Sequence, residues 1–483
     1  IPLRLVGSEM CIRDSGKGAK ADVVRVMFTN GVPQSVLEPQ AGSVVREAQA
    51  LKGSCPYLYV WNGEKFEFYT DLLWNAPLGL QIADGVILRD RPWEFLKVDG
   101  DKLVARDGVY RLQITEELWE AGYFDQVELI AVDHPADVEV FTNEKVGPPD
   151  IAERKIHVVR QRRQPIAATD AYGRDLLPLL AKRDDQFAQC YQRTFRQGLA
   201  EPHYLELNLG PLENAQRVTL LLTGWILPTD TSLNIGFSQN RELDGPRPPY
   251  VLVPDGNRGW REALGFMGFP GGKTKTIAVD VTKLLVPGDA RLRIATSNEI
   301  RWDEAFFTVD EASAEVRETS LQLRSADLHF RGVSRPIPRS SPAIPWRYDY
   351  DDVDVQPAWP PMDGKFTRYG DVRDLLTDWD DRMVVLGSGD EMTLEFDAGP
   401  PVPPGWKRDF LLHSVGWDKD ADIHTVHGQS VEPMPFRAMP SYPYPEAEYP
   451  DTEPIRSYLR KYQTREQPAA RFWRSLQHWP QSQ

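Results

Sequence analysis

Several residue types that mark common protein classes are scarce in this chain of 483 residues. Only 3 cysteines occur, Cys11, Cys55 and Cys190, and they are too few and too widely spaced for a disulfide framework or a cysteine-rich metal site. An oxidising compartment would allow a single Cys55–Cys190 disulfide bond. No stretch approaches about 18 uninterrupted apolar residues, so the sequence predicts no transmembrane segment.

Basic residues are also fewer than acidic ones. The chain has 56 Lys and Arg against 71 Asp and Glu, a net charge of −15. A surface of this sign repels phosphate groups, which argues against binding to nucleic acid or to an anionic membrane by bulk electrostatics.

Motifs of nucleophilic catalysis are missing as well. The sequence contains no G-x-S-x-G elbow, and neither Cys55 nor Cys190 stands in a context that marks a nucleophile. A pair of carboxylates for glycoside hydrolysis depends on a separation in space that sequence spacing does not give. The sequence therefore favours a non-catalytic protein, with no catalytic residues to name, and leaves a hydrolase open.

Apolar residues, proline and glycine are plentiful. Apolar residues make up 41% of the chain, with 40 Pro and 35 Gly. This composition is typical of short strands joined by turns, and the length suits about three domains of roughly 150 residues. We predict a mostly β protein: several antiparallel β-sandwich or barrel units in tandem, with Pro-rich connections and few short helices.

Residues 55–81 carry the strongest local signal. Two aromatic runs flank Asn62-Gly63, a dipeptide typical of a two-residue type I′ hairpin turn. Such a turn places Tyr59 opposite Phe66 and Tyr57 opposite Phe68 on one face. Aromatic pairs of this kind need a partner layer, so we expect the hairpin to dock onto a sheet.

Residues 203–325 have the clearest pattern of a sandwich. Alternating and apolar runs predict a core of Leu205, Leu207, Leu220, Leu222, Leu292 and Ile294. The arrangement resembles a galactose-binding-like sandwich, which is an analogy of fold only. Trp260, Arg258 and Trp302 are the candidate ligand-binding residues, since indole rings stack on sugars, although tryptophans near strand ends usually pack in the core.

Other segments complete the predicted order. They are 51–165, an antiparallel β domain; 166–202, a linker with a helix at 184–197; 326–370, a Pro-rich acidic extended segment; 371–430, a small β unit with a short helix at 371–377; and 431–483, a Pro- and Tyr-rich segment with a helix at 454–464.

Two loops invite a chemical interpretation. The run from Gly268 to Thr274 has glycines and a lysine, but it lacks the phosphate-loop spacing and precedes a strand, so we expect an ordinary loop between strands. Asp418, Asp420 and Asp422 alternate as calcium ligands do, yet Ile423 and Gln429 replace the Gly and Glu of an EF-hand. The sequence favours a solvated acidic loop and no cofactor, with Ca²⁺ as the alternative.

The first fifty residues suggest the chain's origin. Residues 1–15, IPLRLVGSEMCIRDS, resemble sequencing-adapter read-through in assembled environmental DNA, so we expect the natural N-terminus to be missing, with any signal peptide. The run ADVVRVMFTNGVPQSVLEPQAGSVV resembles the end of an ASPIC/UnbV domain, at 16–50. Residues 55–81 resemble the segment that follows it in large CRTAC-like bacterial proteins with FG-GAP (VCBS-type) propeller repeats. The resemblance implies that such repeats lie upstream in the same parent chain.

These observations lead to one expected function and two rivals. We expect the non-catalytic binding or scaffolding region of an exported ASPIC/UnbV-type protein, located outside the cell, in the periplasm or on the cell surface. Its expected partners are glycan or protein surfaces. The alternatives are a carbohydrate-active hydrolase with an appended β-sandwich and a calcium-dependent adhesion module that uses the acidic loops.

Overall fold

The structure is a computed structural model that describes residues 22–27, 31–40, 44, 53–54, 56–356 and 359–467. The chain divides into two compact units, Ile1–Ala50 with Trp473–Gln483, and Leu51–Phe472. The described part of the first unit contains an antiparallel pair, β1 (Val23–Met27) and β2 (Pro33–Leu37). Residues 1–15 and Cys55 lie outside the described residues, and Cys190 is a buried free thiol.

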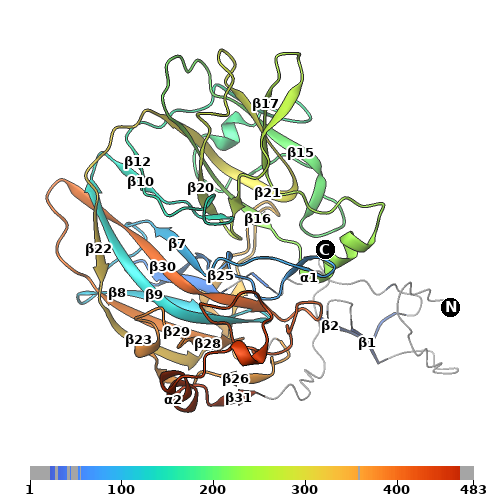
Figure 1. Ribbon diagram of the computed structural model, residues 1–483, viewed down its shortest axis with the longest axis vertical. Coiled ribbons are helices and arrows are strands. Elements are labelled where there is room, and N and C mark those ends of the chain that lie inside the picture. The colour runs from blue at the N-terminus through green and yellow to red at the C-terminus, as the bar shows by residue number, and fades with distance from the viewer. Residues whose placement is uncertain are drawn as a thin grey trace. The chain divides into compact units, whose positions relative to one another are not determined.

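Two antiparallel sheets of the second unit form a sandwich (Figure 1). The first sheet has the order β22 (Arg317–Leu321), β9 (Glu120–Pro135), β30 (Trp406–Asp420), β7 (Trp93–Val98), and β28 (Val384–Gly387) also pairs with β9. The second has the order β27 (Gly370–Asp371), β23 (Leu323–Phe330), β29 (Asp390–Asp397), β8 (Val109–Thr115), β3 (Tyr57–Trp61), β4 (Phe66–Asp71).

The two layers meet through apolar side chains that point inward on alternate strand positions. Tyr110 of β8 and Phe410 of β30 touch across the layers, with ring centroids 4.7 Å apart. Strands β9 and β30 run side by side for their full length, from Glu120 opposite Asp420 to Pro135 opposite Trp406. Strands from residues 57–135 and from 317–420 therefore share both sheets and one core.

A third sheet is built from the residues between these two stretches. It contains β13 (Ala167–Asp170), β15 (Leu199–Asn208), β21 (Arg291–Val309), β16 (Val218–Leu227) and β20 (Lys275–Asp280), joined by β14 (Ala188–Gln189), β17 (Tyr250–Pro254) and β18 (Trp260–Leu264). The first half of β21 pairs with β15 and its second half with β16. The long strand thus connects both parts of the sheet around one core. This core contains all six residues predicted for it, five leucines and one isoleucine.

The hairpin β3–β4 forms with a different turn from the predicted one. The loop has four residues, in which Asn62 caps the turn by accepting a hydrogen bond from the backbone of Lys65 at 2.9 Å. Gly63 has a φ of +102°, whereas Asn62 does not have the positive φ of a type I′ turn. Tyr59 therefore lies opposite Phe68, two residues from the predicted register. A β-bulge between Leu58 and Tyr59 then places Tyr57 opposite Asp71 instead of Phe68. The rings of Tyr57 and Tyr59 nevertheless both contact Phe68, at 5.4 and 5.6 Å between centroids.

The aromatic face of this hairpin has the partner layer that the sequence requires. Tyr57 stacks on Tyr348 at 4.6 Å between centroids, and the two hydroxyls are 2.9 Å apart. Tyr59 contacts Tyr350 edge to face at 5.1 Å. Both partners belong to β25 (Tyr348–Asp354), in the segment predicted to lie extended over its neighbours.

Short elements fill the connections. The pairs are β5 (Gln81–Ala83) with β6 (Val86–Ile87), β10 (Glu139–Phe141) with β12 (His157–Val159), β11 (Lys145–Val146) with β19 (Phe269–Pro270), β24 (Val333–Pro336) with β25, and β26 (Gly364–Phe366) with β31 (Arg465–Gln467). The helices are α1 (Thr231–Gln239) and α2 (Glu453–Lys461), with 3₁₀ turns at Leu177–Leu180, Arg373–Leu375 and Glu446–Glu448.

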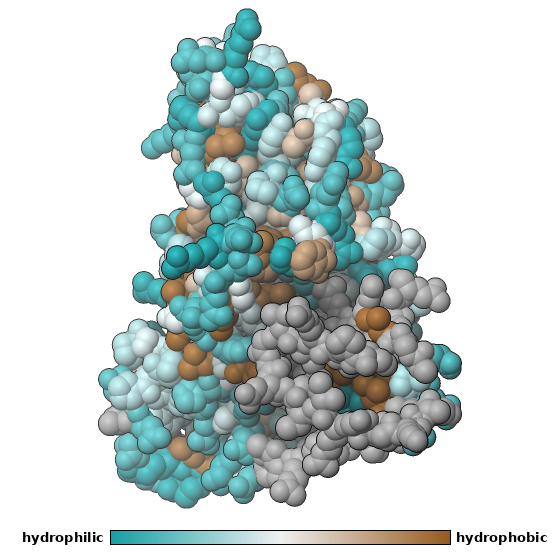
Figure 2. Space-filling view, turned by 90° about the vertical axis from the view of Figure 1, so that its right-hand side faces the viewer, coloured by the Kyte–Doolittle hydropathy of each residue, from teal (hydrophilic) through white to brown (hydrophobic). Residues whose placement is uncertain are grey.

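The sequence predicted only some of the helices. Helix α2 and the turn at Arg373–Leu375 fall where the sequence predicts helices, whereas residues 184–197 contain β14 and turns instead. No helix within the described ranges is long and apolar enough to cross a membrane. The fold class is thus the predicted one, mostly β with antiparallel sheets. On the face in Figure 2, apolar residues occur in small groups among hydrophilic ones.

Candidate metal centre

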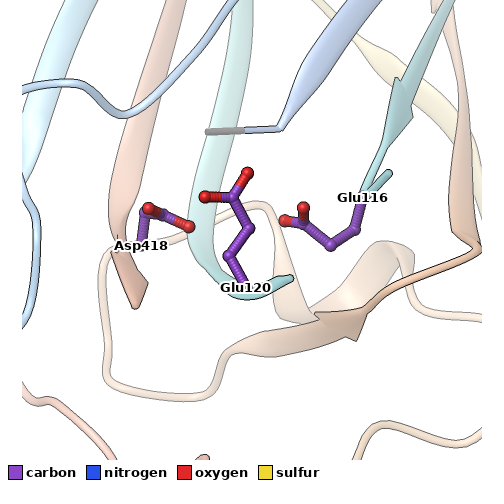
Figure 3. A group of neighbouring side chains, drawn as sticks. All are labelled: Glu116, Glu120 and Asp418. Carbon is purple, nitrogen blue, oxygen red and sulfur yellow. The ribbon is translucent and has the colours of Figure 1, made fainter. Parts of the chain in front are cut away.

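Three acidic side chains converge at one end of the sandwich. Glu116 lies in the connection between β8 and β9, Glu120 begins β9, and Asp418 is near the end of β30. One carboxylate oxygen from each lies within 4.8 Å of the others. Figure 3 shows the three side chains pointing toward one another, with Glu120 in the middle. We call this group the acidic triad.

Backbone hydrogen bonds fix the positions of these residues. Asp418 donates its N–H to the carbonyl of Ala76 at 3.0 Å, and its carbonyl accepts from Leu78 at 2.7 Å. Glu116 donates to the carbonyl of Asp390 at 2.9 Å and accepts from Gly389 at 2.7 Å. Both ends of the triad are therefore held by strand-like pairing to other parts of the chain.

The triad is buried and strongly acidic. The exposed fractions are 0% for Glu116, 2% for Glu120 and 3% for Asp418. Burial raises the pKa of Glu116 and of Glu120 well above the usual value, and the negative charge of Asp418 raises both further. Asp420 adds to the effect on Glu120. At least part of the triad is therefore protonated unless a cation replaces the protons.

The contrast with Glu117 shows how unusual this environment is. Glu117 accepts hydrogen bonds from the hydroxyls of Tyr59, Thr115 and Ser334, at 2.8 to 2.9 Å. Neither carboxyl oxygen of Glu116 has a hydrogen-bond donor in the described part of the chain. Glu120 accepts a long bond of 3.3 Å from the backbone of Ser54. Glu117 is satisfied by the protein, whereas Glu116 faces other carboxyl groups.

Carboxylates gathered in this way can be neutralised by protons, by a cationic side chain or by a bound metal ion. All three ligands are carboxylate oxygens, the type that hard cations such as Ca²⁺ and Mg²⁺ prefer. The acidic triad is therefore a buried group able to hold a metal ion.

The three residues predicted as calcium ligands do not form one site in the structure. Asp418 belongs to the triad, and Asp420 lies two residues further along β30, on the same face of the strand. Asp422 instead accepts hydrogen bonds from the hydroxyl of Ser232 at 2.7 Å and the backbone of His424 at 2.8 Å. Sequence reasoning missed Glu116 and Glu120, although acidic residues at 116, 117 and 120 interrupt an otherwise apolar junction between two strands.

A second buried carboxylate, Asp71, lies beside the triad and is fully paired. Ser54 connects the two, because its backbone donates to Glu120 and its hydroxyl donates to Asp71 at 3.1 Å. The ammonium group of Lys275 lies 2.5 Å from Asp71, and that of Lys273 lies 3.7 Å away. Burial alone would raise the pKa of Asp71, but these two charges outweigh it and lower the pKa.

The glycine-rich run 268–274 supplies Lys273, and Lys275 follows it as the first residue of β20. Its residues 269–270 form β19, and its residues 271–274 form the loop between β19 and β20. The backbone of Lys273 donates to Asp71 at 3.0 Å. Gly272 has a φ of +73°, and a Cβ there would lie 2.3 Å from Asp71 and 2.1 Å from the indole nitrogen of Trp74. The loop therefore holds a carboxylate of its own chain.

The three predicted sugar-binding residues have different surroundings. Trp302 is 3% exposed and belongs to the core of the third sheet. Trp260 on β18 lies under the guanidinium group of Arg293, 3.9 Å from the ring centroid. Arg258 is exposed in the turn between β17 and β18, with a φ of +63°. The buried Trp302 is not available to stack on a ligand.

A pocket of about 210 Å³ adjoins the triad at Glu120. Aromatic side chains form much of its wall, and a charged pair, Asp390 and Arg465, lies at its edge. We call this the aromatic pocket; the aromatic residues that line it are Trp119, Phe330, Trp359, Phe366 and Tyr369.

Comparison with protein-family models, with curated proteins and with solved structures finds no match for this chain. The function is therefore argued from the geometry of the site.

Proposed function

We propose that this chain is a non-catalytic binding or scaffolding region whose β-sandwich binds a calcium ion at the acidic triad. Its ligands are carbohydrate or protein surfaces outside the cell. The observation that carries the proposal is the convergence of Glu116, Glu120 and Asp418 within 4.8 Å, in a buried environment where Glu116 lacks a hydrogen-bond donor among the described residues.

Calcium is the cation that this group suits best. Calcium–oxygen bonds are about 2.3–2.6 Å long, so two oxygens on one ion lie at most about 5 Å apart. The oxygens of the triad lie within 4.8 Å of one another, which is compatible with a calcium ion between them. Magnesium binds at about 2.0–2.1 Å and usually keeps several water molecules, which a site with side chains at most 3% exposed accommodates poorly. The triad has neither the imidazole nor the thiolate ligands that zinc favours.

The setting of the chain agrees with a calcium site. The ASPIC/UnbV resemblance at 16–50 implies a large exported bacterial protein. Extracellular modules bind calcium with dissociation constants of about 10⁻⁴–10⁻³ M, which suits a site with few ligands. In such modules the ion stabilises the fold that carries the binding surface.

A carbohydrate-active hydrolase is the second candidate, since two carboxyl groups of raised pKa, Glu116 and Glu120, lie close to a pocket. Glycosidases need one protonated and one ionised carboxyl on either side of a bound sugar. The exposed fractions of 0% and 2% argue against it, because the reacting bond must reach both groups.

Calcium titration of the full chain tests the proposal. After treatment with EDTA and its removal, isothermal titration with CaCl₂ at pH 7.5 is expected to show one ion per chain and a rise in melting temperature. Glu116→Gln is expected to abolish both effects while the chain stays folded, since it removes a charge from an acidic cluster. Glu213→Gln, an exposed acid in a loop, is the matched control and keeps both.

Two results would contradict the proposal. Absence of calcium binding in the unaltered chain would rule out the proposed calcium site. Turnover of a glycoside substrate that Glu116→Gln abolishes would instead establish the hydrolase.

A further inference from the structure

The aromatic pocket combines apolar rings with polar groups. Tyr369 is 40% exposed and Phe330 is 46% exposed, so two of its aromatic residues have accessible surface. Trp119 and Trp359 are parallel to within 3°, with ring centroids 6.1 Å apart. The exposed rings of Tyr369 and Phe330 can pack against the C–H face of a sugar ring, whereas Trp119 and Trp359, 3% and 7% exposed, stack on each other.

One donor on the pocket wall lacks a partner. Trp119 is 3% exposed, and its indole N–H has no hydrogen bond within the described ranges. A buried N–H without an acceptor destabilises a fold, so such groups normally have a hydrogen-bond partner. A hydroxyl group of a ligand in the pocket could supply an acceptor for this N–H.

The polar edge favours a neutral ligand rich in hydroxyl groups. Arg465 is paired with Asp390, which also accepts a hydrogen bond from the hydroxyl of Tyr369 at 2.9 Å. The charges of this pair cancel, so a charged ligand gains little there. A neutral hydroxyl group can accept a hydrogen bond from the guanidinium group of Arg465, whose side chain is 18% exposed. By contrast, Asp390 is 1% exposed and already accepts from Tyr369 and Gly387.

The pocket and the acidic triad share a segment of chain. Trp119 lies between Glu116 and Glu120 in the connection from β8 to β9, and its carbonyl accepts a hydrogen bond from Ala421 at 2.9 Å. Glu120 belongs to the triad and also lines the pocket. An ion bound to Glu116 and Glu120 would hold both ends of this short connection and so fix the ring of Trp119.

From these observations we infer that the aromatic pocket binds a single neutral sugar ring, with Trp119 donating to a hydroxyl group, and that calcium at the acidic triad is required for this binding. The inference rests on the proposed calcium function and names its ligand class. Sugar binding thus lies on the sandwich, away from the residues that the sequence suggests, Trp260 and Arg258.

Binding of the full chain to an array of neutral mono- and disaccharide glycosides, with calcium and with EDTA, tests the inference. The best glycoside is then titrated calorimetrically. Trp119→Phe keeps an aromatic ring and removes the N–H, and we expect about tenfold weaker binding from the lost hydrogen bond. Glu116→Gln and EDTA are expected to weaken binding at least as much, while Trp260→Phe is the control and leaves it unchanged.

The outcomes separate the two proposals. Calcium binding without glycoside binding contradicts the inference but not the proposed calcium site. Glycoside binding that Trp119→Phe leaves intact does the same. Binding of choline in place of every glycoside also overturns it, because aromatic pockets attract quaternary ammonium ions as well. Failure of calcium to bind, with glycoside binding indifferent to EDTA, overturns both.

Discussion

Lys275 donates a hydrogen bond to Asp71 although 204 residues separate them in the sequence. Asp71 ends β4 in the sandwich, and Lys275 begins β20 in the third sheet. Their side chains are 0% and 3% exposed. This buried ion pair therefore fastens the third sheet to the sandwich, next to the acidic triad.

Replacing Lys275 with methionine is expected to destabilise the chain. Removing one partner of a buried ion pair typically costs about 3–5 kcal/mol, because the other charge stays buried. Urea unfolding at pH 7 measures the loss. The double variant Asp71→Asn with Lys275→Met should recover part of it, and equal stability of Lys275→Met and the unaltered chain would show that Asp71 does not depend on this partner.

The same ion pair predicts the behaviour in acid. The pKa of Asp71 lies below its ordinary value of 3.8 in the folded chain. Its contribution to stability is therefore present above about pH 4 and lost as the pH falls through the lowered pKa.

Gly272→Ala should be far more damaging than Gly288→Ala. Both glycines have a positive φ, +73° and +80°, which costs an alanine about 1–2 kcal/mol. A Cβ at 288 has no atom within 4 Å, whereas one at 272 meets Asp71 and Trp74 below 2.5 Å. The difference in unfolding free energy between the two variants isolates the close approach, and similar values would contradict it.

Glu94 should make stability fall as the pH rises. Burial raises its pKa from 4.5 to about 7. Between these values the unfolded chain loses the proton and the folded chain keeps it, so stability decreases with pH, by up to roughly 3 kcal/mol. In urea unfolding, the free energy of unfolding of Glu94→Gln should change less between pH 4.5 and 7 than that of the unaltered chain. A slope equal to that of the control variant Glu213→Gln would contradict this role of Glu94.

Calcium affinity should rise with pH. The raised pKa values of Glu116 and Glu120 mean that an incoming ion must displace protons from them. Titrations at pH 6, 7 and 8 are expected to give a dissociation constant that falls at each step, with protons released to the buffer. A constant that is independent of pH would contradict protonation of the triad.

Local patterns predicted a large part of this fold, because alternation decides which side chains face inward. The core of Leu205, Leu207 and Leu292 follows from it, and the hairpin keeps its aromatic face despite a shifted register. Pairing between distant strands, such as β9 with β30, leaves no local signal.

The candidate site illustrates the same limit. Asp418 was a candidate metal ligand because it belongs to a run of alternating acids, although that run lacks the Gly and Glu of an EF-hand loop. Glu116 and Glu120 are about 300 residues away, and only the fold brings them to Asp418. Their burial, which makes them candidates for metal binding, is a property of the packed layers rather than of the local sequence.

The most direct test of the calcium site is anomalous X-ray diffraction from crystals grown with calcium. We expect a peak at the acidic triad, about 2.3–2.6 Å from oxygens of Glu116, Glu120 and Asp418. A triad without such a peak, with Glu116 and Glu120 sharing a proton instead, would contradict the account.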